Sequence, residues 1–159
     1  MSVDHCAGCG RAIAGGTAAC RAEFEAACAF DYEGGVPYVL HRLTVDTYSL
    51  QHPDDFCASG KSLVAHLVGL LVWAEHDGRQ ELQRTLRDWI DGPREIDRPS
   101  LPSSRGALTL GDVTSFATPE QRAAALERWA RATWDAHQEV HAIARRWFRA
   151  ARTQGRQRC

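Results

Sequence analysis

The rest of the chain is organised around His41-Arg-Leu-Thr-Val-Asp-Thr-Tyr-Ser-Leu-Gln-His-Pro53, in and before which apolar residues recur at the spacing of a helix. Steps of three and four residues predict one amphipathic helix. Pro37 suits a first helical turn, and Pro53 disfavours helical geometry at the residue before it, so the helix should end at about Gln51. The apolar stripe comprises Val36, Leu40, Leu43, Thr47 and Leu50.

The same stretch carries groups that bind metals or transfer protons. His41 and His52 would share a helix face with Tyr48, but eleven residues place the two histidines about 16 Å apart along the axis. Metal–nitrogen bonds are only about 2 Å long, so these two histidines cannot bind one ion unless the helix breaks, and a metal site must take ligands from elsewhere. Alternatively both are structural, with His52 at the helix end and His41 half-buried beside a hydrogen-bond partner.

Length and composition indicate one globular domain over residues 1–159. Apolar residues make up 44% and charged residues 25%, which excludes a disordered chain, and a net charge of −1 argues against nucleic-acid binding. The longest uncharged apolar run, residues 63–74, is shorter than the roughly 20 residues that a bilayer requires. No signal-peptide pattern is visible. We therefore expect a cytoplasmic protein whose six cysteines are thiols or metal ligands rather than disulfides.

Residues 1–16 form a Gly-rich lead that contains the turn Cys6-Ala-Gly-Cys9. Two thiolates at this spacing can bind one tetrahedral zinc ion, but a full site needs two more ligands and no second C-x-x-C exists. A redox function would require the pair at a helix N-terminus in a βαβ context, which the Gly-rich flanks argue against. Two thiols without special function are the remaining alternative.

Further segments have helical periodicity. Residues 17–32 include Cys20, a candidate third ligand, and Cys28, which we interpret as a small core residue. Residues 62–76 are apolar nearly all round and should be the most buried helix, so His66 within it needs a polar partner or a metal. Residues 79–90 form another helix, and residues 91–107 a long loop that should cover a site or wrap the core.

Thr118 begins a helix that could continue for nine turns, because no Gly or Pro follows before Gly155. His137 and His141 lie four residues apart on it, so both imidazoles could reach one ion. Gln138 excludes the H-E-x-x-H motif of zincin peptidases. Residues 145–158 contain six arginines and no acidic residue, which is typical of a solvated helix end.

Five motifs together resemble those of a bacterial domain family of unknown function: C-x-G-C-G, H-R-L-T-V-D-x-Y-x-x-Q-H-P, H-L-x-x-L, R-G-A-L-T-x-x-D-V and W-x(6)-H-x-x-x-R-x-W. The resemblance spans nearly the whole chain and implies no known activity. His137 falls outside the family pattern, which favours His141 acting with partners on other helices. The matching residues are Cys6, Cys9, Cys20, His41, Asp46, Tyr48, Gln51, His52, Pro53, His66, Trp134, His141, Arg145 and Trp147. A weaker similarity to DinB-type helical bundles would place a divalent ion on His66, His137 and His141.

We therefore expect an all-α fold: four to five helices as a bundle over residues 17–153, the Cys-rich lead packed against it, and a disordered tail at 154–159. The leading functional hypothesis is a structural zinc site. Cys6 and Cys9 would supply two ligands, and Cys20, His52 or His141 the other two.

Two other classes of function remain open from the sequence. One is a metal-dependent enzyme, of hydrolase or thiol-transferase type, with a polar pocket between helices lined by His41, Asp46, Tyr48, His66 and His141. The other is a metal-free interaction domain. A homo-oligomer is possible for each of these functions. The sequence determines neither the substrate, the oligomeric state nor the physiological metal.

Overall fold

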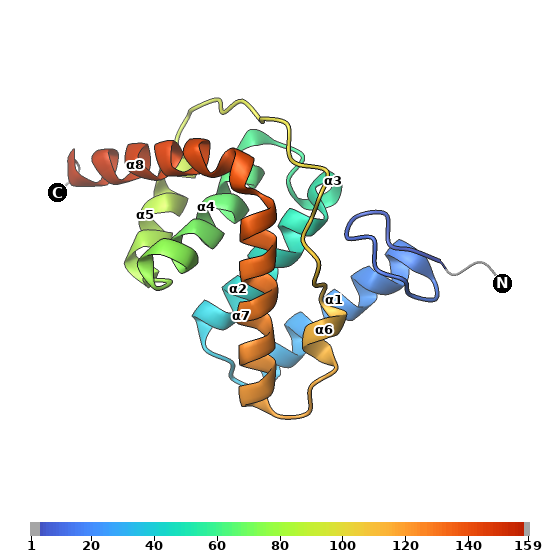
Figure 1. The fold of residues 1–159 in the computed structure, drawn as a ribbon. Coiled ribbons are helices and arrows are strands. Elements are labelled where there is room, and N and C mark those ends of the chain that lie inside the picture. Colours follow the sequence, from blue (N-terminus) through green and yellow to red (C-terminus); the bar gives the residue numbers. More distant parts are fainter. Residues whose placement is uncertain (1–3, 158–159) are drawn as a thin grey trace.

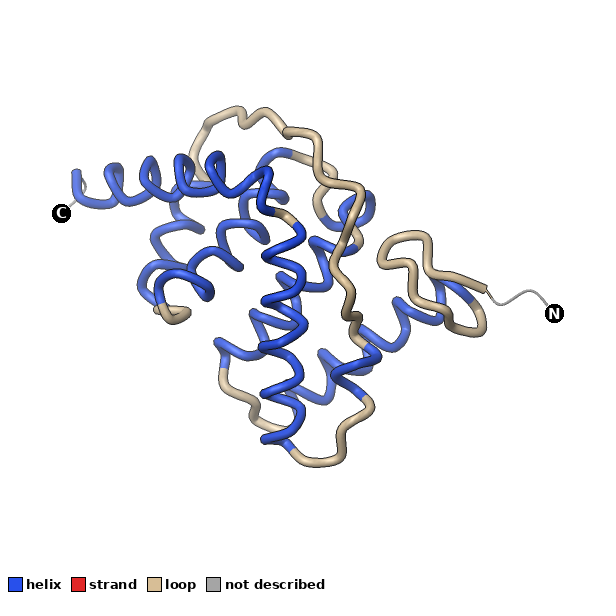
Figure 2. Tube along the Cα trace, viewed as in Figure 1, coloured by secondary structure: helices blue, strands red, loops and turns tan. Residues whose placement is uncertain are grey.

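Eight α-helices and one 3₁₀ turn build the part of the chain that the computed structural model describes, residues 4–157 (Figures 1 and 2). These residues contain no strand, only an isolated antiparallel bridge between His5 and Ala12, so the predicted all-α class is confirmed. The elements are α1 (Gly16–Glu33), α2 (Tyr38–Gln51), α3 (Pro53–Phe56), α4 (Gly60–His76), α5 (Gln80–Ile90), α6 (Gly111–Thr114), α7 (Pro119–Ala136), the 3₁₀ turn (Gln138–Val140) and α8 (His141–Gln157).

Helix α2 lies in the middle of the molecule and packs against α1, α4 and α7. It begins after Pro37 and ends at Gln51, as the two prolines predict. The residue before Pro53, His52, has φ −126° and ψ 56°, so the chain leaves the helix there. The predicted end of α2 is therefore confirmed, and it sets the position of His52.

Helix α4 is buried on nearly all sides, as its apolar sequence predicts. Ser59 caps it through a reciprocal pair of hydrogen bonds with Ser62. The apolar side chains at its centre are inaccessible to solvent: Leu63, Val64, Leu67, Val68, Leu70, Leu71 and Val72. Helices α2, α5, α7 and α8 all pack on it.

The segment between α5 and α6 runs across the molecule without regular structure, and the buried side chain of Gln51 holds its second half (Figure 1). Gln51 Nε2 donates to the carbonyl oxygens of Arg105 and Leu108, both at 2.8 Å. Gln51 Oε1 accepts from Trp129 Nε1 at 3.0 Å. A single amide at the end of α2 therefore fastens this strap, defined as residues 91–110, to α2 and α7.

The prediction of one uninterrupted helix from Thr118 is wrong, because the chain turns sharply at His137 between α7 and α8 (Figure 1). His137 Nδ1 donates to the Thr133 carbonyl at 2.8 Å, and His141 Nε2 donates to the Trp134 carbonyl at 2.9 Å. These imidazoles satisfy carbonyls at the end of α7 that would otherwise accept only from backbone N–H groups. The helix can therefore end without glycine or proline.

Helix α8 continues to Gln157, so residues 154–157 of the expected disordered tail are helical. Gln154 Oε1 accepts from Arg94 at 2.6 Å, and Gly155 packs so closely on α5 that an added Cβ would lie 3.2 Å from Thr85 Cγ2. These two contacts hold the end of the helix. Residues 158 and 159 lie outside the described part of the chain.

Candidate metal centre

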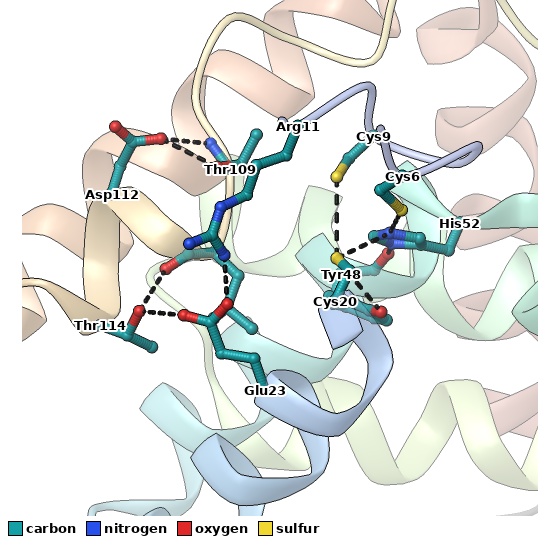
Figure 3. Close-up of polar contacts among 11 residues, drawn as sticks. Cys6, Cys9, Arg11, Cys20, Glu23, Tyr48, His52, Thr109, Asp112 and Thr114 are labelled. Atoms are coloured by element: carbon teal, nitrogen blue, oxygen red, sulfur yellow. Dashed lines mark hydrogen bonds and ion pairs between the residues drawn. The ribbon is translucent and has the colours of Figure 1, made fainter. Parts of the chain in front are cut away.

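Cys6, Cys9, Cys20 and His52 converge at one point, although they come from three separate parts of the chain (Figure 3). One ligand atom from each of the four lies within 4.8 Å of every other. Cys6, Cys20 and His52 are buried, and Cys9 is half-buried. In residues 4–157, no other group of three or more His, Cys, Asp or Glu side chains comes together in this way.

The lead brings Cys6 and Cys9 to the cluster on a tight turn. Gly10 N–H donates to the Cys6 carbonyl at 2.9 Å, and Cys6 N–H donates to the Arg11 carbonyl at the same distance. Gly10 has a φ of 75°, which a residue without a side chain adopts without strain. The C-x-x-C-G pattern thus folds into a turn that points both thiols inward.

The lead is also held against the helices beside the turn. Arg11 forms an ion pair with Glu23 of α1, and Glu23 in turn accepts a hydrogen bond from Thr114 of α6 at 2.5 Å (Figure 3). Ala7 N–H donates to Thr17 Oγ1 at 2.9 Å. These contacts place the turn over the first half of α1, where Cys20 lies.

Cys20 lies on the buried face of α1, where aromatic rings fix its surroundings. The Phe24 ring stacks on Tyr48 with centroids 3.9 Å apart, and the Tyr48 ring stacks on His52 at 3.8 Å. Tyr48 Oη donates to Cys20 Sγ at 3.7 Å. Tyr48 therefore contacts two members of the cluster and supports both.

His52 presents only one of its nitrogens to the thiols. Its Nδ1 lies 2.8 Å from the Tyr48 carbonyl, and because a carbonyl only accepts, Nδ1 carries a proton. Its Nε2 lies 3.3 Å from Cys6 Sγ and 3.5 Å from Cys20 Sγ. A backbone carbonyl that binds one imidazole nitrogen and directs the other inward is the usual support of a metal-binding histidine.

The sulfur spacing fits a tetrahedral ion. Ligands about 2.3 Å from one zinc ion lie roughly 3.8 Å apart at tetrahedral angles. Cys9 Sγ and Cys20 Sγ are 3.8 Å apart, and the His52 contacts at 3.3 and 3.5 Å suit the shorter zinc–nitrogen bond. The three thiols are free rather than disulfide-bonded.

The electrostatics of the cluster separate the three thiols. Burial raises the pKa of Cys6, but the backbone N–H groups of Cys9 and Gly8 and the His52 ring outweigh it, so the pKa is lowered. The hydrogen bond from Cys20 lowers the pKa of Cys9, and the same bond, together with burial, raises the pKa of Cys20 to about 12.

The pKa of the His52 imidazole is raised. Burial acts to lower it, but the contacts of the ring with Cys20, the Tyr48 carbonyl and Cys6 outweigh burial. Three adjacent thiolates repel one another, and a bound divalent cation would remove that repulsion.

A family model with the description "Family of unknown function (DUF5946)" matches residues 4–138 of the chain. The chain belongs to this family. The match contains all four residues of the cluster and extends to the turn between α7 and α8. The resemblance to a family of unknown function is thus confirmed. No curated protein and no solved structure matches the chain.

The structure places His141, the other predicted metal ligand, away from the cluster. Its Nε2 donates to the Trp134 carbonyl, and its ring stacks on the Trp134 indole with centroids 3.7 Å apart. His137 directs its Nδ1 to a different carbonyl, that of Thr133. The two histidines therefore act at the turn between α7 and α8, and neither joins the group of four.

The five residues predicted for an enzymatic pocket lie in separate surroundings. Asp46 contacts His66 at 2.9 Å, whereas His41 contacts Asp31 at 3.4 Å. Tyr48 belongs with the thiols and His141 with Trp134. Only the Asp46–His66 contact joins two of the five.

Among the helices of residues 4–157, none is long and apolar enough to span a membrane.

Proposed function

We propose that the protein binds one zinc ion through Cys6, Cys9, Cys20 and His52 and that this ion has a structural role. The observation that carries the proposal is the convergence of four ligand atoms within 4.8 Å. Three thiolates with one imidazole form a common structural zinc site, and soft thiolate ligands favour zinc over magnesium, calcium or manganese.

The structural role is supported by the number of ligands and by the segments they join. Four protein ligands complete a tetrahedral shell and leave no position for a catalytic water. The ligands would connect the lead to the first half of α1 and to the end of α2. The lead has few apolar side chains of its own, so we expect the ion to supply most of the free energy that orders it.

The test is the metal content of protein purified without chelator, measured by elemental mass spectrometry. We expect about one zinc per chain, because one four-ligand site binds one ion. The variants Cys6→Ser, Cys20→Ser and His52→Ala should each lose the metal and melt at a lower temperature. Cys28→Ser is the matched control, since Cys28 is half-buried on α1 and outside the cluster.

Cobalt substitution gives an independent reading of the ligand set. Cobalt bound by three thiolates and one imidazole should show intense tetrahedral absorption bands and thiolate charge-transfer bands. Metal retained in Cys6→Ser, or no metal in the unmodified protein, would refute the proposed site. A zinc ion that carries an exchangeable water ligand in the wild-type protein would refute the structural role and favour a catalytic ion.

A further inference from the structure

A second site lies on the face of α2 that carries Arg42. A cavity of about 440 Å³ opens between α2, α4 and α5, and we refer to it as the arginine cavity. Arg42, Arg84 and Arg87 line it, together with Tyr38, Gln80 and Gln83. Its volume falls within the roughly 300–1,000 Å³ of pockets that hold small molecules. Arg42 precedes His52 by ten residues, or about 15 Å of helix, so this cavity is separate from the thiol cluster.

The sequence of α5 builds one wall of the cavity. Leu82, Leu86 and Trp89 bury one face of the helix in the core. Polar residues recur at three- and four-residue steps on the neighbouring face, which therefore points into the cavity. This second stripe comprises Gln80, Gln83, Arg84, Arg87 and Asp91.

Arg42 is held in place from behind by a buried carboxylate. Its Nη2 donates to Asp46 Oδ1 at 2.6 Å, and His66 Nδ1 contacts the same oxygen at 2.9 Å. Asp46 is buried against Gly69, where an added Cβ would lie 2.3 Å from Asp46 Oδ2. The guanidinium of Arg42 is therefore anchored at Nη2.

The cavity is bordered by more basic than acidic groups: Arg42, Arg84 and Arg87 line it, Asp46 pairs with Arg42, and Asp91 is the one acidic residue among the described residues of the lining. The Nε–H of Arg42 is buried and has no acceptor among residues 4–157, and a buried donor without an acceptor is uncommon in proteins. In the described part of the chain, neither Arg84 nor Arg87 forms an ion pair. One carboxylate, that of Asp91, lines the cavity with them. Three neighbouring guanidinium groups favour an anion with several oxygens, because one guanidinium can donate two parallel hydrogen bonds to such a group.

The rest of the lining indicates that the anion is part of a larger molecule. Ile90 of α5 and Ala65 of α4, both partly exposed, supply an apolar surface beside the arginines, and the buried Leu86 also borders the cavity. A free inorganic ion would leave this surface in contact with water. We propose that the arginine cavity binds a small organic anion, with a phosphate monoester or carboxylate on the arginines and an apolar body against Ile90 and Ala65.

The test uses phenyl phosphate and benzoate as anionic probes and benzamide as the uncharged probe. Each is titrated into the metal-loaded, ¹⁵N-labelled protein while the backbone amides and arginine Nε–H signals are followed by NMR. We expect saturable shifts at residues 38–42 and 80–91 and at the Arg42 Nε–H for the anions, with benzamide at least about tenfold weaker. The tighter of the two anions identifies the phosphate or carboxylate as the preferred group.

Matched variants separate this site from general electrostatic attraction. Arg84→Gln/Arg87→Gln removes two exposed cavity charges and should weaken the anions about tenfold or more. Arg146→Gln/Arg149→Gln removes two exposed charges of α8 that do not line the cavity, and should change binding by less than about twofold. The proposal is overturned by the absence of saturable shifts, by benzamide binding as well as the anions, or by equal losses in the two double variants.

Discussion

The Nε2 atom of His52 lies 3.3 Å from the Sγ atom of Cys6, although 46 residues separate the two in the chain. The contact depends on a glycine as much as on the two ligands. Gly8, in the turn between Cys6 and Cys9, packs directly on the imidazole, and a Cβ there would lie 2.3 Å from His52 Cδ2. The turn can therefore approach the end of α2 only because residue 8 has no side chain.

Gly8→Ala should displace the His52 ring and reduce zinc occupancy and melting temperature together. Gly10→Ala is the control, because an added Cβ there has nothing within 4 Å. Its only cost is the left-handed backbone, of about 1–2 kcal/mol. Metal content and thermal melts of both variants provide the comparison. If Gly8→Ala bound zinc at full occupancy, the close contact between residue 8 and the His52 ring would not be needed for metal binding.

Asp46→Asn should destabilise the protein by about 3 kcal/mol, because it leaves the Arg42 guanidinium without the buried carboxylate that neutralises it. Urea unfolding, measured with zinc present, provides the number. Glu75→Gln is the matched change in the exposed pair of Glu75 with Arg145 and should cost less than about 1 kcal/mol. Equal costs for the two variants would contradict a special role for the buried pair.

Gln51→Leu should cost about 2–4 kcal/mol, because it leaves Trp129 Nε1 and the carbonyls of Arg105 and Leu108 without partners. Hydrogen exchange and limited proteolysis should show the largest change in residues 91–110. Gln121→Leu, at an exposed position of α7, should stay within about 0.5 kcal/mol of the wild-type protein. Unchanged protection of the strap would show that other contacts hold it.

His137 should make the protein less stable in mild acid. Its ring is fully buried, and burial lowers its pKa below the ordinary value of 6.5 despite the hydrogen bond to the Thr133 carbonyl. The unfolded chain then binds a proton more readily than the folded protein. The contribution to stability is complete above pH 6.5 and is lost as the pH falls below it.

The measurement is the free energy of unfolding at pH 7.5 and 5.5, with zinc present, for the wild-type protein and His137→Asn. Asparagine places an N–H donor near the position of Nδ1 but does not titrate. The variant should therefore lose less stability between the two pH values. Zinc release by acid affects both proteins alike and cancels in the comparison. Identical losses would refute a neutral, buried His137.

Local features of the chain were predictable because they depend on residues only a few positions apart. Proline at 53 ends α2, Thr118 caps α7, and the apolar period of residues 62–76 produces a buried helix. The same local logic failed at His137, because the signals that end α7 are imidazoles bonded to carbonyls rather than a glycine or proline. Only the folded arrangement of the rings reveals that turn.

The arginine cavity was not anticipated from the sequence. A signal was present in the polar period of Gln80, Gln83, Arg84 and Arg87, but a polar helix face usually meets solvent. What makes it a cavity is the approach of α2 and α4, and in particular of Arg42 held by Asp46.

The all-α class, the ends of α2 and the C-x-x-C turn of the lead follow from local sequence, since helical period, proline geometry and glycine turns act within a few residues. The choice of distant side chains that complete the cluster depends on how the helices pack. Cys20 and His52 join Cys6 and Cys9, while His141 stacks on Trp134. The physical reason is that ligand atoms must converge within a few ångströms, and the packing of α1 against α2 and of the lead on both sets those distances.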